Sequence, residues 1–227
     1  MSENINVFAS AWLRDLSVEQ VRRLSEITEF VDLGSDDTVY AMSGPQEYLW
    51  GISSGQVRVH VALNEEEPML GHIHRAGAWF GESELIQNVD GLVEMKAYGE
   101  TKLAKIAYTR FRKLAKTTPD IWEAFARLAS MNQLLAMSAA NDLVLRKSKD
   151  RIAATLLRLS GRRGVIQGTQ TSDIVEVNQQ DLARLANIVR SKASVHLRAL
   201  ADEGYIEPQY AAIRLLDPVG LSNSIGR

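Results

Sequence analysis

The residues best suited to chemistry lie in one short segment near the C-terminus, between Arg190 and Asp202. At helical spacing, its outward side carries cations and hydroxyls with one apolar residue: Arg190, Ser191, Ser194, Val195 and Arg198. Its opposite side is apolar, with Ala193, Leu197 and Leu200. A helix of this kind packs on a core and presents positive charge to water, which suits the binding of a polyanion.

The distribution of charge along the chain supports a polyanionic partner for this segment. The 227 residues carry a formal charge of −2, yet residues 1–145 contain 13 Lys and Arg against 20 Asp and Glu, a net −7. Residues 146–227 contain 13 against 8, a net +5. An acidic body joined to a basic C-terminal region indicates that the basic region meets the polyanion.

Other kinds of chemical site find little support. The chain has no cysteine, which excludes disulfides, thiolate-bound zinc and iron–sulfur clusters and favours a cytoplasmic location. His72 and His74 could share a metal, but a packed or surface pair is the commoner interpretation, so we predict no metal, haem or other cofactor. Glu82 and Glu84 could form an acid–base pair, but no GxSxG, P-loop or GxGxxG motif accompanies them, and we expect no enzyme activity.

Length and composition fit a soluble globular protein of one or two domains, with 45% hydrophobic and 24% charged residues. No stretch approaches the about eighteen apolar residues of a membrane span. The first residues also lack a basic segment leading into an apolar one, so we expect no contact with a membrane.

The basic segment follows a second short helix, and the pair predicts a helix-turn-helix. Asn178 can cap a helix that starts at Gln179. Asn187 tolerates the left-handed geometry of a tight turn, and Gly204 ends the second helix. Three strands are expected at residues 174–177, 205–206 and 212–216, and a covering helix at residues 151–159. Together they would complete a winged helix-turn-helix.

Residues 30–108, after a short helix over 17–28, have the pattern of a small β-domain. Short apolar or alternating runs predict strands at residues 39–40, 48–52, 57–63, 69–73 and 103–107. Glycines such as Gly55 separate these runs, and the acidic Glu65–Glu67 is expected at a hairpin tip. Many short strands divided by glycine turns predict a compact β-sandwich or barrel.

From Pro119 the chain has no further Gly or Pro until Gly161, which predicts a long helix. A 4-3-4-3-4 spacing typical of a coiled-coil seam joins Ile121, Phe125, Leu128, Asn132, Leu135 and Ala139. A second stripe contains Trp122, Ala129, Ala136 and Leu143. We predict that one apolar side of this helix packs on the β-domain and that the seam packs on a second copy of the helix, where Asn132 fixes the register. Packing on both sides within one chain is the alternative.

Residues 182–206, LARLANIVRSKASVHLRALADEGYI, resemble the DNA-binding signature of the CRP/FNR family of bacterial transcription regulators. Gly34, the run Tyr48 to Gly55 and the run Gly77 to Glu82 resemble the glycine framework of that family's cyclic-nucleotide-binding β-roll. The resemblance covers essentially the whole chain and implies an α+β fold. Its three parts would be a β-roll (double-stranded β-helix, jelly-roll-like), a long dimerisation helix and a winged helix-turn-helix, over residues 1–118, 119–145 and 146–227.

The resemblance implies that the second helix enters the major groove of double-stranded DNA. Arg190, Ser191 and Val195 then occupy base-reading positions, and Arg190 can bind guanine O6 and N7. Phosphate contacts are implied for Lys192, Ser194 and Arg198. A homodimer would bind a near-palindromic operator with half-sites about 34 Å apart, and RNA polymerase is the implied protein partner. A regulator active without ligand and a DNA-bending protein without sequence preference are the alternatives.

The effector site that the resemblance implies is incomplete. Nucleotide-binding members hold the cyclic phosphate with a Gly-Glu pair and an Arg-Ser or Arg-Thr pair some ten residues later. Gly81-Glu82 matches the first pair, but Gly91-Leu92 stands at the second and Asp90 precedes it, so no guanidinium is available. On the long helix, Ala136-Met137 replaces the Thr-Ser that meets the base. We expect either a less charged effector than cyclic AMP or a pocket filled by its own side chains.

Overall fold

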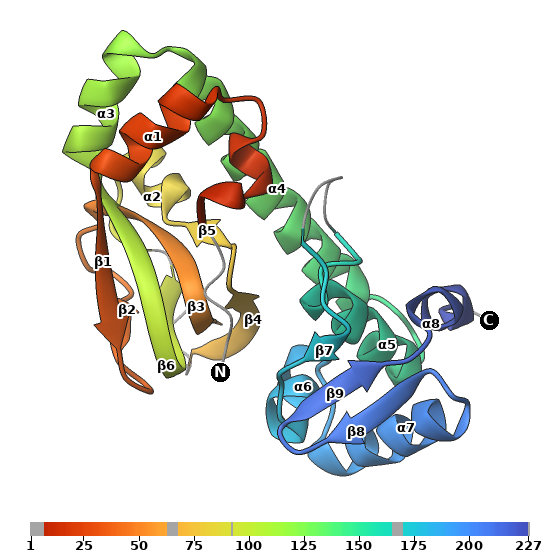
Figure 1. The fold of residues 1–227 in the computed structure, drawn as a ribbon. Coiled ribbons are helices and arrows are strands. Elements are labelled where there is room, and N and C mark those ends of the chain that lie inside the picture. The colour runs from red at the N-terminus through yellow and green to blue at the C-terminus, as the bar shows by residue number, and fades with distance from the viewer. Residues whose placement is uncertain (1–6, 63–67, 92, 165–169, 227) are drawn as a thin grey trace. The chain divides into compact units, whose positions relative to one another are not determined.

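A computed structural model describes residues 7–62, 68–91, 93–164 and 170–226 (Figure 1). Leu92 and Glu65–Glu67, for which the sequence predicted a pocket position and a hairpin tip, lie outside the described residues. The chain divides into two compact units, Met1–Asn132 and Gln133–Arg227. The sequence placed divisions after residues 118 and 145, whereas the division between these units falls inside one continuous helix, α4 (Asp120–Leu143).

The first unit is an antiparallel β-roll with helices along its edge. Its strands are β1 (Thr28–Leu33), β2 (Thr38–Tyr40), β3 (Tyr48–Val61), β4 (Met69–Arg75), β5 (Trp79–Phe80) and β6 (Val93–Ala107). Its helices before α4 are η1 (Val7–Ala9), η2 (Ala11–Leu13), α1 (Val18–Glu26), α2 (Glu82–Gln87) and α3 (Tyr108–Thr117). The sheet order is β1-β6-β3-β4, with β2 paired to β6 and β5 to β3, and α1 lies beside α3 (Figure 1).

Strand β3 joins two runs that the sequence predicted as separate strands. The register against β6 shifts between Ile52 and Gln56, and Gly55 between them has φ +81°. A Cβ at Gly55 would lie 2.5 Å from the carbonyl oxygen of Glu100, so a larger residue does not fit. Gly55 therefore marks a bulge that bends one long strand rather than a turn that ends it.

The first turns of α4 pack into the roll, which corrects part of the predicted dimer seam. Phe125 and Leu128 are 1% and 2% exposed and belong to the core cluster that also contains Trp12 and Trp79. The ring of Phe125 lies 4.8 Å from that of Phe111 on α3. Side chains buried this completely within their own chain have no surface left for a second copy. The alternative left open by the sequence, packing within one chain, holds for this half of the helix.

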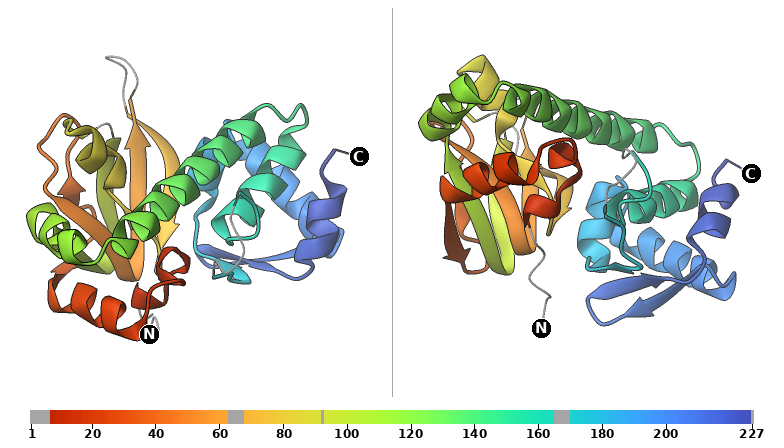
Figure 2. Two further views of the ribbon diagram at one scale, coloured as in Figure 1. Left: turned by 90° about the horizontal axis from the view of Figure 1, so that it is seen from above. Right: turned by 45° about the horizontal axis from the view of Figure 1, so that its top comes forward.

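The second unit contains the predicted winged helix-turn-helix. Its helices after α4 are α5 (Ser148–Leu159), α6 (Gln179–Leu185), α7 (Arg190–Asp202) and α8 (Pro218–Ser224). Its strands, in the sheet order β7-β9-β8, are β7 (Ile174–Val175), β8 (Ile206–Gln209) and β9 (Ala212–Leu215). The β8–β9 hairpin is the wing, and α5 packs against α6, α7 and α8 (Figure 2).

Candidate nucleic-acid interface

Helix α6 begins at the predicted cap. The Oδ1 atom of Asn178 accepts a hydrogen bond from the backbone N–H of Asp181 at 2.8 Å, and its Nδ2 donates to the Asp181 carboxylate at 2.7 Å. Asn187, in the turn between α6 and α7, has φ +49°, the left-handed conformation expected of it. Cap and turn together fix where α7 starts.

Helix α7 presents the predicted basic face. Its buried residues are Ala193, Leu197 and Leu200, as the sequence predicted. The side chains that are exposed as a result include Arg190, Ser191, Lys192, Val195 and Arg198, while Ser194 is half-buried. Because α7 buries its apolar side, the six residues that the sequence singled out lie together on the rest of its surface.

The cations on this face are available to an external anion. Within the part of the chain that the structure describes, Arg190, Lys192 and Arg198 form no ion pair. The neighbouring Arg184 and Arg214 are exposed and lie 3.7 Å from Asp181 and 3.9 Å from Glu207, long distances for ion pairs. Unpaired cations on one surface attract phosphate without first breaking an internal contact.

His196, on α7 itself, does not add to this charge. Its Nε2 lies 2.7 Å from the Ser148 hydroxyl on α5. Burial, together with the cations Lys149, Lys192 and Arg151, lowers the pKa of His196 below its ordinary value of 6.5. The imidazole therefore stays neutral at neutral pH and acts as a structural contact.

A groove of about 390 Å³ adjoins the start of α7, and sequence reasoning missed it. Its polar lining comes from three elements and includes Asn178, Gln179, Gln180, Arg190, Gln209 and Tyr210. Tyr210 is fully exposed at the wing tip, next to Ala211 with φ +53°. The only sequence signal was the position of Tyr210 between two predicted strands. A phosphate backbone lying along α7 would meet amide donors and Arg190 in this groove.

The predicted effector residues in the roll surround a buried acid. Gly81 has φ +94° at the start of α2, and Glu82 is 4% exposed. The Nδ2 atom of Asn132 on α4 donates to Glu82 Oε1 and to the carbonyl oxygen of Trp79, both at 3.0 Å. Burial raises the pKa of Glu82 above its ordinary value. Asn132, predicted to lie in a dimer seam, connects α4 to the roll through these two hydrogen bonds.

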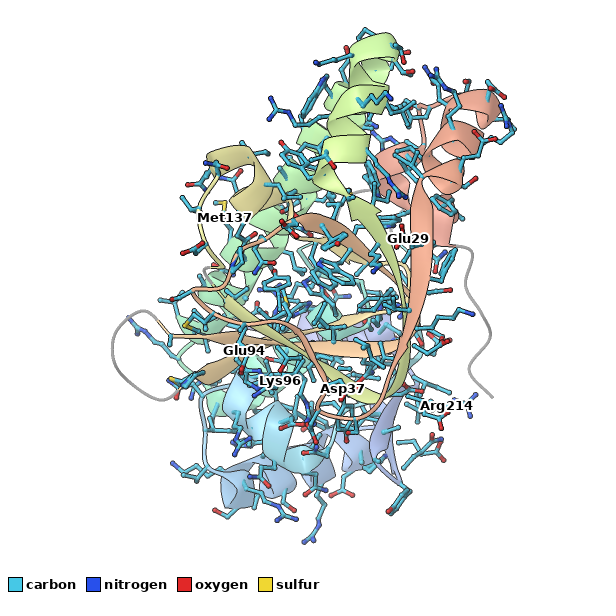
Figure 3. All side chains as sticks on the ribbon, turned by 90° about the vertical axis from the view of Figure 1, so that its left-hand side faces the viewer. Glu29, Asp37, Glu94, Lys96, Met137 and Arg214 are labelled. Atoms are coloured by element: carbon cyan, nitrogen blue, oxygen red, sulfur yellow. The ribbon has the colours of Figure 1, made fainter. Side chains whose placement is uncertain are left out.

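The remaining predicted effector residues offer no positive charge. Gly91 is buried, and a Cβ there would lie 2.7 Å from the carbonyl oxygen of Ala41. Asp90 is exposed, and Leu92 lies outside the described residues. On α4, Ala136 and Met137 (Figure 3) are both exposed. These residues cannot neutralise a phosphate.

The second half of α4 leaves apolar side chains in water. Leu135 and Ala139 of the predicted seam are half-buried. Leu134, Met137 and Val144 are exposed, Met137 by 61% and Val144 by 75%. With Asn141 they follow a 3-4-3 spacing, so this exposed stripe lies on one side of the helix and its continuation.

His72 and His74 lie side by side in the roll. His74 is buried and its ring stacks on Phe80 at 5.6 Å, with His72 edge-on at 4.9 Å, so the pair packs as a structural element. Among the described residues, no group of three or more His, Asp or Glu side chains could hold a metal ion. None of the helices in the described ranges is both long and apolar enough to cross a membrane.

Comparison with known proteins identifies both units. Residues 30–118 match the family model of the cyclic nucleotide-binding domain, and residues 150–224 match that of the Crp-like helix-turn-helix domain. The chain is 22% identical to the transcriptional regulatory protein btr of Bordetella pertussis over 93% of this chain and 88% of that protein. It is 24% identical to the transcriptional regulator SdrP of Thermus thermophilus over 87% and 95%.

Among solved structures, FixK2 from Bradyrhizobium japonicum shares the fold, with a TM-score of 0.73 and 16% identity over 88% of this chain and 98% of that one. The roll, the long helix and the winged helix-turn-helix therefore follow one another here as they do in that structure. The chain belongs to the CRP/FNR family of transcription regulators.

Proposed function

We propose that this protein is a homodimer that binds a near-palindromic DNA operator and regulates transcription, with an effector other than cyclic AMP. The observation that carries the proposal is the outward face of α7, where Arg190, Lys192 and Arg198 are exposed without ion pairs in the described part of the chain. Arg190 at the start of the helix can read guanine, and the other two cations can hold phosphate. RNA polymerase is the expected protein partner.

The dimer would form through the exposed stripe of α4. Leu134, Met137 and Val144 are large apolar side chains in water, and Asn141 is a polar seam residue that can fix the register. A second copy offers the same residues at the same spacing, as a two-fold interface requires. This face replaces the part of the predicted seam that the roll core takes up.

The exclusion of cyclic AMP is supported by charge. Where the family's second pair would supply a guanidinium, the roll has Gly91 preceded by the exposed Asp90. The carboxylate of Glu82, in the first pair, already accepts a hydrogen bond from Asn132. The same hydrogen bond favours the second candidate, a regulator that is active without ligand, because it joins α4 directly to the roll.

Selection from a random duplex DNA pool by the purified protein, with and without cyclic AMP, tests the proposal. We expect one palindrome to be enriched without the nucleotide. Enrichment only with cyclic AMP would refute the effector assignment, and enrichment of bent or flexible DNA without a consensus would favour the DNA-bending alternative. A variant with Arg190, Lys192 and Arg198 changed to Gln should enrich nothing. The control, with Lys113 and Lys116 of α3 changed to Gln, should recover the wild-type palindrome.

A further inference from the structure

The last turns of α4 form a docking face for the end of α5. Leu134, Ser138 and Asp142 are spaced four residues apart and so lie on one side of the helix. Gly164, just after α5, sits against this side with φ +67°, and a Cβ there would lie 2.2 Å from the Ser138 Cβ and 3.7 Å from the Leu134 carbonyl oxygen. The chain after α5 thus approaches α4 as closely as only glycine permits.

Two arginines meet one aspartate at this face. The Nε atom of Arg158, on the last turn of α5, donates to Asp142 Oδ2 at 3.0 Å, and the Nε of Arg163 donates to Oδ1 at 2.6 Å. The side chains of Asp142 and Arg158 are each 1% exposed, and that of Arg163 is 26% exposed. We call these three residues the ionic clasp.

Helix α5 is also the element on which the DNA-binding helices rest. Arg151 Nε donates to the carbonyl oxygen of Ala186 at the end of α6, at 2.9 Å. Lys149 pairs with Glu203 at the end of α7, and Ser148 contacts His196 within α7. The direction of α7 relative to the last turn of α4 therefore depends on how α5 is held.

We propose that the ionic clasp positions the DNA-binding helices on α4 and so sets the half-site spacing that a dimer recognises. The proposal rests on the proposed function, since spacing matters only to a dimer on DNA. Directional hydrogen bonds between planar groups restrict the angle at which α5 docks, whereas apolar packing tolerates several angles. Asp142, Arg158 and Arg163 are thus positioning residues that need not touch DNA.

The first test measures the position without DNA. The chain has no cysteine, so spin labels can be attached at Ala136→Cys on α4 and Asp202→Cys on α7, with excess unlabelled protein to isolate single labelled chains. We expect one narrow distance distribution in the otherwise unaltered protein and a broader or shifted one in Asp142→Asn. Asp120→Asn, an exposed change on the first turn of α4, is the matched control and should leave the distribution unchanged.

Asp142→Asn removes the carboxylate charge that the buried Arg158 contacts, and this variant could fail to fold. Arg163→Gln removes one of the two bonds from a partly exposed side chain and serves as the second variant, with the exposed Arg146→Gln as its control. A wild-type distribution in the folded Asp142→Asn protein, or in Arg163→Gln where Asp142→Asn does not fold, would overturn the proposal.

The second test measures spacing on DNA. The selected palindrome is compared with versions that have one base pair added or removed between the half-sites, and with a duplex that carries a single half-site. We expect a preference of about tenfold for the selected spacing in the wild type and under about threefold in Arg163→Gln, with unchanged affinity for the single half-site. An unchanged spacing preference, or an equal loss on the single half-site, would contradict positioning. If the wild type selects no palindrome, the proposed function fails, and the distance measurement still decides the clasp.

Discussion

The roll and the DNA-binding unit differ in what they leave exposed. In the roll, α4 buries Phe125 and Leu128, and several cations are paired within the chain: Lys105 and Arg110 both contact Glu29, and Lys96 lies 3.0 Å from Glu94 (Figure 3). In the other unit, the same helix exposes an apolar stripe, and α7 exposes cations that form no ion pair with any residue the structure describes. Substitutions in the roll should therefore alter stability, whereas those on the exposed surfaces of the second unit should alter association.

The largest expected effect lies in the roll core. Phe125→Ala removes a ring packed against Phe111 and Trp122, and should lower the free energy of unfolding of the roll by about 3–5 kcal/mol. The four tryptophans, at positions 12, 50, 79 and 122, all belong to the first unit, so denaturation followed by tryptophan fluorescence reports on the roll alone. Met137→Ala is the control and should leave this transition unchanged. Dissociation of a dimer with no loss of roll stability would contradict the assignment of Phe125.

The next effect depends on pH and also belongs to the roll. Burial lowers the pKa of His74 from 6.5 to about 4. Between pH 4 and pH 6.5 the unfolded chain binds a proton at His74 that the folded roll does not bind. The contribution of His74 to the free energy of unfolding is therefore fully present above pH 6.5 and is lost as the pH is lowered. The loss should reach about 3 kcal/mol near pH 4. His74→Gln should flatten this part of the curve, and the difference between the two curves separates His74 from Glu82, whose raised pKa acts with the opposite sign. Parallel curves would show that His74 titrates normally.

The exposed stripe should control association rather than folding. Met137→Glu with Val144→Glu places four like charges in a two-fold interface and should raise the dimer dissociation constant at least about a hundredfold, near 3 kcal/mol. Sedimentation equilibrium measures the change, and the fluorescence transition of the roll should not move. An intact dimer in this double variant would place the interface elsewhere. Lys113→Gln with Lys116→Gln on α3 changes the charge of each chain by the same −2 and provides the charge-matched control.

The DNA-binding surface was predictable because its signals are local. The buried side of α7, the cap at Asn178 and the left-handed Asn187 all follow from residues within a few positions of each other. A helical period shows which side chains share a face, and α7 has one apolar face to bury. Nothing further was needed to bring Arg190, Val195 and Arg198 to the surface.

The packing partners of α4 were less predictable, because the helical spacing of its apolar residues does not show which element they contact. Phe125 and Leu135 lie on one seam in the sequence, yet the first is buried in the roll and the second is half-buried. Asn132 looked like a register residue, and its contacts, Trp79 and Glu82, lie fifty residues away. Long-range contacts of this kind, like that between Asp142 and Arg158, leave no trace in spacing.

A smaller effect distinguishes base reading from charge. Arg190→Ala should cost about 1–3 kcal/mol of specific affinity and relax the preference at one base position, because one bidentate contact to guanine is lost. Lys192→Ala is the matched comparison, and it should weaken all sequences alike and reduce the dependence of binding on salt concentration. Binding titrations on the selected palindrome and its single-base variants measure both. A uniform loss for Arg190→Ala would move that residue from the bases to the phosphates.

The smallest effects concern the N-terminal caps of α6 and α7 in the helix-turn-helix, because only one of these helices has a side-chain cap. Asn178 caps α6 with its side chain, whereas Val189 gives α7 no side-chain cap. Asn178→Ala should therefore destabilise the second unit by about 1 kcal/mol, and Val189→Ser should stabilise it by a similar or smaller amount. Denaturation followed by far-UV circular dichroism measures the unfolding free energy of both variants. Gln179→Ala is the control, and its unfolding free energy should stay within about 0.5 kcal/mol of the wild-type value. Because neither substitution alters the charge of α7, the base preference of the selected palindrome should persist in both. A changed base preference in Val189→Ser would mean that the start of α7 is held by DNA itself, through the N–H groups that the chain leaves uncapped.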